Sequence, residues 1–141
     1  MPTHLFKTEP GTYSYADLAR DKRTAWEGVT NNAALIHLRN CRKGDEVFIY
    51  HTGDEKAIVG LARVIASPYE DPAKPGQTPS GEPKFAMVDL APVKAAKTPL
   101  TLAAMKADRR FASFALVTHS RLSVMPVPPD IDTLVRTLTG L

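Results

Sequence analysis

Two short apolar runs separated by a turn set the first limit on the fold. Residues 46–51 (Glu-Val-Phe-Ile-Tyr-His) lie between Gly44-Asp45 and Thr52-Gly53-Asp54, and residues 58–66 are rich in β-branched side chains. Short runs of this kind bounded by turn residues predict strands. Two such strands joined across a turn form a hairpin, so the sequence predicts antiparallel pairing in this part of the chain.

Helices are predicted on both sides of this hairpin. Ser14 and Asp17 have the spacing of a capping box, which indicates a helix that starts at Tyr15. A second helix is predicted over residues 31–40, before the helix-stopping Gly44. The clearest helix lies near the C-terminus, between Pro129 and Gly140. Its apolar residues recur at the spacing of one helix face: Ile131, Leu134, Val135 and Leu138.

The remaining segments complete an α+β pattern. Further strands are predicted over residues 4–8, 85–93 and 122–127, with Pro92 indicating an edge or a bulge. Thr101 is predicted to cap a short helix. Residues 67–84 contain five prolines and two glycines, which predicts an exposed, poorly ordered loop. Hairpins with inserted helices indicate an α+β mixed sheet or a small barrel. The regular alternation of strand and helix that a doubly wound fold requires is absent.

Length and composition favour one domain spanning residues 1–141. The chain has 141 residues, 43% of them hydrophobic, and a single cysteine that excludes an internal disulfide. The first residues show no signal-peptide pattern, and no apolar run approaches the ~18 residues of a membrane span. We therefore expect a cytoplasmic protein that does not contact membranes. The net charge of +3 permits nucleic-acid binding without requiring it.

The sequence predicts neither a metal site nor a cofactor. Its four histidines lack ligand spacing, and the nucleophile elbow, the phosphate-binding loop and the dinucleotide-binding turn are all missing. An enzyme would have to use Cys41 with a distant histidine, or Glu9 as a general base. Cys41 follows a predicted helix, where the helix dipole raises a thiol pKa, and Glu9 is one isolated carboxylate. We therefore expect a protein that binds without catalysis.

Four short motifs, in order and spacing, carry a family resemblance. They are Lys7-Thr8-Glu9-Pro10, Trp26-Glu27-Gly28-Val29, Tyr50-His51 and Ser120-Arg121-Leu122-Ser123-Val124. With them the chain resembles the EVE domain family over nearly its whole length. The resemblance implies a PUA-like fold, a mixed β-barrel with surrounding helices. It also implies non-catalytic binding of a modified nucleic-acid base, such as methylated or hydroxymethylated cytosine, in an aromatic-lined pocket of a protein whose partner is DNA or RNA.

The resemblance also implies which residues form the base-binding pocket. A base removed from its stack needs an aromatic face, and Trp26 would supply it as a platform or wall. Lys7 and Thr8 would line the pocket from the first strand. Gly28 would let the backbone approach the base, since a Cβ would intrude. Val29 would follow at the mouth with Asn31, whose amide could read a base edge as both donor and acceptor.

The other implied pocket residues come from later in the chain. Tyr50 and His51 would form the opposite wall, and Arg121 and Ser123 would contact phosphate or base. Ordinary structural roles remain open for these side chains. Trp26 could be core, His51 a hydrogen-bonded histidine at a strand end, and Arg121 an ion-pair partner.

One segment departs from the family pattern. Relatives usually continue Arg-Asn-Tyr-Gln-Ala-Arg-Asn-Asn after the tryptophan motif, whereas residues 30–37 here are Thr-Asn-Asn-Ala-Ala-Leu-Ile-His. Only Asn31 and Ala34 match in place. The missing arginine, tyrosine and glutamine are groups that a nucleic-acid site would use. The alternative function is therefore a pocket for another small planar ligand or a protein partner, without nucleic acid.

Overall fold

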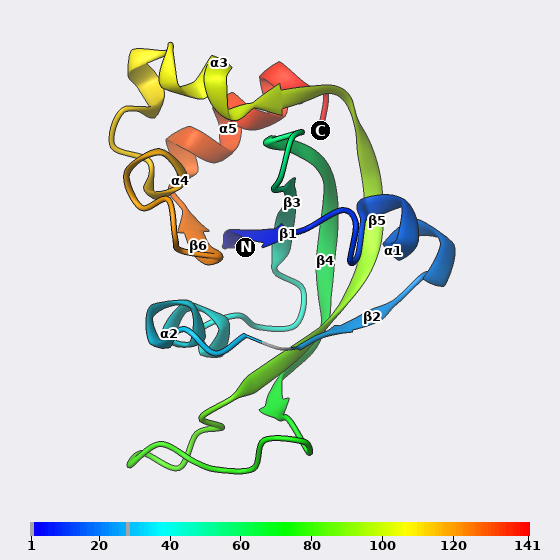
Figure 1. Ribbon diagram of the computed structural model, residues 1–141, viewed down its shortest axis with the longest axis vertical. Coiled ribbons are helices and arrows are strands. Elements are labelled where there is room, and N and C mark those ends of the chain that lie inside the picture. Colours follow the sequence, from blue (N-terminus) through cyan, green and yellow to red (C-terminus); the bar gives the residue numbers. More distant parts are fainter. Residues whose placement is uncertain (1, 28) are drawn as a thin grey trace.

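The computed structural model describes residues 2–27 and 29–141, and its frame is a six-stranded sheet (Figure 1). The strand order is β2-β5-β4-β3-β1-β6. The strands are β1 (Thr3–Thr8), β2 (Thr24–Trp26), β3 (Glu46–His51), β4 (Ala57–Glu70), β5 (Ala86–Thr101) and β6 (Val124–Val127). β1 and β3 pair in parallel and the other neighbours are antiparallel, which confirms the predicted mixed α+β sheet.

The described strands do not close into a barrel. β2 and β6 are the two edges of the sheet and pair only with β5 and β1 respectively. The implied barrel is therefore corrected to an open sheet. β4 and β5 are long and curved (Figure 1), and the β4–β5 pairing contains several register shifts. Such irregularities bend a strand and increase its twist.

Five helices and one 3-10 turn surround the described strands. They are α1 (Tyr15–Asp21), α2 (Asn32–Arg39), α3 (Leu102–Lys106), α4 (Ala115–Thr118) and α5 (Pro129–Thr139), with η1 (Arg109–Phe111) after α3. α3 and α5 lie at one end of the molecule, and α2 lies toward the other (Figure 1). None of the helices within residues 2–27 and 29–141 has the length and apolar character that crossing a bilayer requires.

Local signals place the helix ends where the sequence predicts them. The N–H of Asp17 donates to Ser14 Oγ at 3.0 Å, and the N–H of Ser14 donates to Asp17 Oδ2 at 2.9 Å, so the capping box is confirmed. The N–H of Ala34 donates to Asn31 Oδ1 at 3.1 Å, which starts α2. Gly140 ends α5 with φ +80°, a left-handed conformation that favours glycine.

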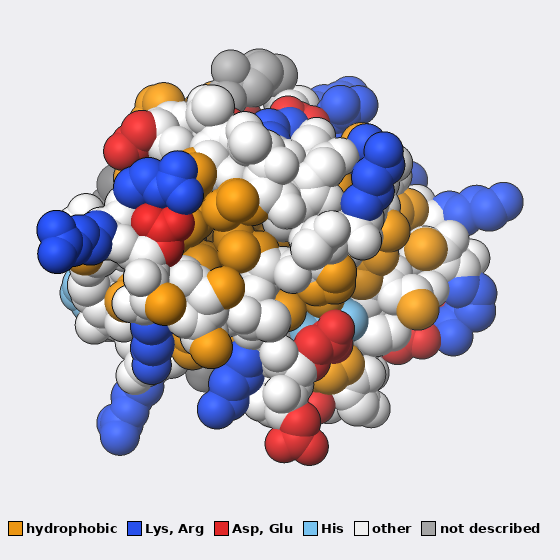
Figure 2. Space-filling model, turned by 90° about the horizontal axis from the view of Figure 1, so that it is seen from above, with side chains coloured by type: hydrophobic (Ala, Val, Ile, Leu, Met, Phe, Trp, Pro, Cys, Tyr) orange, Lys and Arg blue, Asp and Glu red, His pale blue; other side chains and the backbone are white. Residues whose placement is uncertain are grey.

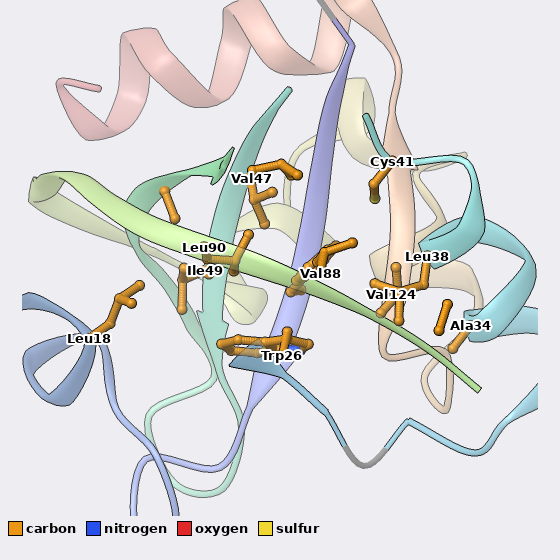
Figure 3. Packing of buried hydrophobic residues seen from close by; sticks show 14 of the residues in the cluster. Leu18, Trp26, Ala34, Leu38, Cys41, Val47, Ile49, Val88, Leu90 and Val124 are labelled. Carbon is orange, nitrogen blue, oxygen red and sulfur yellow. The ribbon is translucent and has the colours of Figure 1, made fainter. Parts of the chain in front are cut away.

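Two apolar cores lie on the two faces of the sheet. Neighbouring strand residues alternate between them, as Leu5 and Phe6 do in β1, because successive side chains of a strand point to opposite faces. The first core lies under α1 and α2 and includes Leu18, Leu38 and Trp26 (Figure 3). The second core lies under α3, α4 and α5.

The segment predicted as a proline-rich loop is partly strand. β4 runs to Glu70, and the hydroxyl of Tyr69 donates to Asp89 Oδ1 on β5 at 2.5 Å. Asp71 is buried, and its side chain accepts a hydrogen bond from the N–H of Ala73. Many of the loop residues that follow are exposed, as predicted. The expectation of a loop from residue 67 was wrong, because β4 stays paired with β5 as far as Glu70, four residues beyond the predicted strand end.

Candidate functional site

A cavity of about 560 Å³ opens where β1 and β2 end. Its walls are the end of β1 with the turn after it, β2 with the segment that follows, and Ser123 just before β6. Six of the predicted pocket residues line it: Lys7, Thr8, Trp26, Val29, Asn31 and Ser123. Gly28 lies outside the described residues.

Trp26 belongs to the first core and to the cavity wall at once. Only 9% of its surface is exposed, and its ring centroid lies 5.6 Å from that of Phe6. Tyr13 meets the indole edge-on, with the ring planes at 84° and the centroids 6.4 Å apart. Pairing of β2 with β5 sets Trp26 opposite Val88 (Figure 3). The ring is therefore held rigidly, as a stacking platform requires.

Lys7 lines the cavity and carries a partly buried ammonium group. Its Nζ donates to the carbonyl oxygen of Ser120 at 2.9 Å and lies 5.8 Å from the ring centroid of Tyr50. Burial lowers the pKa of Lys7, because desolvation disfavours the charged form. The other charged residues in the described part of the wall are Glu9 and Glu27. Two carboxylates and one ammonium make this cavity a poor site for phosphate.

The turn after β1 supplies wall residues that the sequence analysis missed. Thr8 Oγ1 donates to the carbonyl oxygen of Tyr13 at 2.6 Å, which folds the turn back and brings Tyr13 to Trp26. The carboxylate of Glu9 accepts from the N–H of Gly11 at 3.1 Å and from Thr52 Oγ1 at 3.2 Å. Glu9 belongs to the Lys-Thr-Glu-Pro motif, which could have marked it as a wall residue. Nothing in the sequence singles out Tyr13.

The side chain of Asn31 caps a helix, which uses part of its capacity for hydrogen bonds to a ligand. Its amide oxygen accepts the N–H of Ala34 and so caps α2. One of the two lone pairs of this oxygen is therefore used within the protein. Its amide nitrogen remains as a donor for a ligand.

Arg121 lines a second cavity, of about 630 Å³, and not the first one. This second cavity lies between α2, α4 and the loop before β6, and it also contains His37 and His119. Asn31 lines both cavities.

A family model described as the EVE domain matches residues 3–138. The chain belongs to the EVE domain family. Thymocyte nuclear protein 1 of Mus musculus is 32% identical over 154 residues, covering 89% of this chain and 68% of that protein. A Rhodopseudomonas palustris protein solved by NMR is 40% identical, with a TM-score of 0.89 over 99% of this chain and 94% of the other.

A third relative is known with a ligand. The human THYN1 protein, crystallised in complex with DNA containing 5-methylcytosine, is 28% identical to this EVE domain. The two structures match with a TM-score of 0.87 over 100% of this chain and 99% of the other. The fold of this EVE domain is the α+β, PUA-like fold of its family.

Tyr50 and His51 do not line the first cavity, which corrects the expected opposite wall. Tyr50 points into the second core, and His51 points the other way, toward α1. The N–H of Tyr15 donates to His51 Nε2 at 3.0 Å, so Nδ1 carries the proton and donates to Glu55 Oε1 at 2.6 Å. His51 therefore holds the start of α1 on the sheet. The second aromatic residue of the cavity wall is Tyr13, which packs edge-on against Trp26.

Cys41 is placed as a core residue. Its side chain is fully buried, and Sγ donates to the carbonyl oxygen of His37 at 3.6 Å. Burial, with the nearby charge of Asp45, raises the pKa of the thiol to about 12, so the reactive thiolate is disfavoured. In the described ranges, no group of three or more His, Cys, Asp and Glu side chains could hold a metal ion.

Proposed function

We propose that this EVE domain binds nucleic acid by holding one modified base, of the 5-methylcytosine class, in the first cavity. The observation that carries the proposal is Trp26, a rigid aromatic wall in a cavity of about 560 Å³. That volume falls within the range of about 300–1,000 Å³ common for small-ligand sites. The relationship to the human THYN1 protein supports the class of ligand.

The charged wall residues suit the edge of a cytosine. The ring presents an exocyclic amine that donates hydrogen bonds, and carboxylates are its usual partners in proteins. Glu9 and Glu27 supply carboxylates, and Lys7 supplies an ammonium donor for a ring nitrogen or carbonyl oxygen. Stacking on Trp26 would add about 1–3 kcal/mol of binding free energy. The cavity therefore offers a flat face and both kinds of hydrogen-bonding group.

A role in binding without turnover is supported by the state of the candidate catalytic groups. Cys41 is buried in the core and disfavours its thiolate form. Glu9 lines the cavity, but its two carboxylate oxygens already accept hydrogen bonds from the N–H of Gly11 and the hydroxyl of Thr52. Neither residue is arranged as an activated nucleophile or base.

The test uses Trp26 as its own reporter, because it is the single tryptophan of the chain. Single-stranded oligonucleotides that differ only in one cytosine, unmodified, 5-methylated or 5-hydroxymethylated, are titrated at two salt concentrations. We expect a modified strand to change the Trp26 fluorescence and to bind more tightly than the unmodified control. Affinity should fall as salt rises, because phosphate contacts release counterions.

A variant completes this test. Trp26→Phe keeps an aromatic ring in the core but offers a smaller face, so we expect weaker binding of a labelled modified strand with the fold retained. Phe114→Leu, a substitution in the second core at a residue that lines neither cavity, is the control. Equal affinity for all three strands would overturn the proposal. Salt-independent binding of a free planar compound alone would favour the alternative function, a pocket that does not use nucleic acid.

A further inference from the structure

The second cavity differs from the first in its charge. Three of its lining residues carry basic groups, Arg121, His37 and His119, and no acidic residue is among those described for its wall. The first cavity holds two carboxylates instead. The first cavity therefore suits an uncharged ring, and the second cavity suits a negatively charged group such as a phosphate of a nucleic acid.

Arg121 is the group best placed to contact phosphate. Its side chain is exposed, and no ion pair joins it to an acidic side chain within residues 2–27 and 29–141. Nδ1 of His119 lies 2.7 Å from the hydroxyl of Thr118, which fixes the imidazole at the same rim. A planar guanidinium without a protein partner matches the geometry of a phosphate group.

Part of the lining of the second cavity is apolar. Ala115, Leu122 and Pro126 contribute to it, beside the half-buried His37. Burial, with a smaller effect of His4, lowers the pKa of His37 and favours its neutral form. A neutral imidazole among aliphatic side chains can pack against a sugar or a base, whereas Arg121 at the rim faces solvent.

The two cavities share a wall. Asn31 lines both of them. In the loop before β6, Leu122 lines the second cavity and its neighbour Ser123 lines the first. Lys7, in the wall of the first cavity, donates to the carbonyl oxygen of Ser120 in the wall of the second at 2.9 Å. A strand with one base in the first cavity can therefore continue directly over this wall.

We propose that the second cavity binds the nucleotide adjoining the base held in the first cavity. Arg121 contacts its phosphate, and the apolar lining residues pack against its sugar or base. This inference rests on the proposed function, because it requires a base in the first cavity. It adds a second subsite that recognises the strand and not the modification.

The experiment compares a ligand that fills one cavity with a ligand that reaches both. The nucleoside 5-methyl-2′-deoxycytidine has no phosphate, and a single-stranded oligonucleotide with one 5-methylcytosine has neighbours on each side. Arg121→Ala removes the charge, and Ala33→Leu fills part of the second cavity from the exposed face of α2. The matched controls, Arg109→Ala and Ala19→Leu, change exposed residues that line neither cavity.

We expect Arg121→Ala to weaken binding of the oligonucleotide about tenfold or more, as for loss of a hydrogen bond to a charged group. The slope of log affinity against log salt should fall by about 0.7 for one lost phosphate contact on a single strand. Ala33→Leu should also weaken oligonucleotide binding. Binding of the nucleoside should be the same in both variants, both controls and the wild type.

Different outcomes separate this inference from the proposed function. If the wild type prefers the modified strand and both variants bind it normally, the second subsite is refuted and the base-binding proposal stands. If either variant weakens nucleoside binding as much as oligonucleotide binding, the effect comes from the first cavity and the inference fails. If the wild type binds neither ligand, both proposals fail together.

Discussion

At the scale of single residues, Trp26 combines two roles that the sequence left as alternatives. The residue lies on an edge strand, so its ring packs against Phe6 in the core and also borders the cavity. The residues that hold the ring come from β1 and from the turn after it. Sequence motifs identify Trp26 as a candidate, but they do not show which side chains will pack around it.

Cys41 gives a prediction with a defined dependence on pH. Burial raises the pKa of its thiol from the usual 9.0 to about 12. Between these values the native state keeps a proton that the unfolded state loses, so stability falls as pH rises through this window. We expect Cys41→Ala to flatten this decline by at most about 1.4 kcal/mol for each pH unit. Urea unfolding near neutral pH and at about pH 10 measures the two slopes.

The neutral-pH measurement is the control for Cys41→Ala, because it isolates the loss of packing from the loss of the titrating group. If the free energy of unfolding falls with pH equally in the wild type and the variant, the thiol does not contribute to this pH dependence.

The sequence analysis expected residues of one motif to line one pocket together, and the structure separates them for one physical reason. Tyr50 and His51 form one motif, yet adjacent residues of a strand point to opposite faces, and neither points into the cavity. Ser123 and Arg121 also share a motif but line different cavities. A motif fixes position along the chain, whereas the direction of each side chain depends on the sheet around it.

At the scale of elements, the packing of α1 against the sheet depends on one glycine. A Cβ at Gly60 of β4 would lie 2.4 Å from Cε1 of Tyr15, so only glycine lets the ring lie this close to the strand. The hydroxyl of Tyr15 donates to the carbonyl oxygen of Leu61 at 2.8 Å. The backbone N–H of Tyr15 is held by His51. The ring and hydroxyl of Tyr15 and the start of α1 are therefore fixed together.

We expect Gly60→Ala to lower the free energy of unfolding by about 1–3 kcal/mol, the usual cost of overpacking. The added methyl group must displace the Tyr15 ring and with it α1. Gly11→Ala is the matched control, since its Cβ would meet only Glu9 Oε1, at an ordinary 3.5 Å. Urea unfolding compares the three proteins, and a midpoint for Gly60→Ala equal to that of wild type would contradict this account of α1.

Most elements could be predicted because their signals are local. The capping box of Ser14 and the periodicity of α5 involve residues within a few positions of one another. β2 was missed because three residues are too short to show alternation. β5 was predicted too short, over residues 85–93, whereas the strand continues to Thr101. The bulge that Pro92 indicated is confirmed by a register shift in the β4–β5 pairing.

At the scale of the whole molecule, charge is dispersed, and not gathered into one stripe, over the face seen in Figure 2. Seen from the end that carries α3 and α5, Lys and Arg side chains project from many points around the margin, with apolar side chains between them (Figure 2). The net charge is only +3. The few cations beside the two cavities therefore matter more for nucleic-acid binding than the overall charge.

The two cores share one sheet, so we expect residues 1–141 to unfold as one domain in a single transition. Loss of either core would expose one face of every central strand. Thermal or urea unfolding followed by far-UV circular dichroism and by Trp26 fluorescence checks this. Trp26 reports the first core only, so curves that do not coincide would show that the two faces unfold separately.

The place of β1 inside the sheet has a consequence for the order of events during folding. β1 pairs in parallel with β3, and its other neighbour is β6, from a distant part of the sequence. The N–H of Lys7 donates to the carbonyl oxygen of Ser123 at 2.9 Å, which joins two walls of the first cavity. Pairings between distant segments form slowly, because a long loop must close first. We therefore expect a newly collapsed chain to form its helices before the walls of the first cavity meet, so that the ability to bind a ligand there is acquired late in folding.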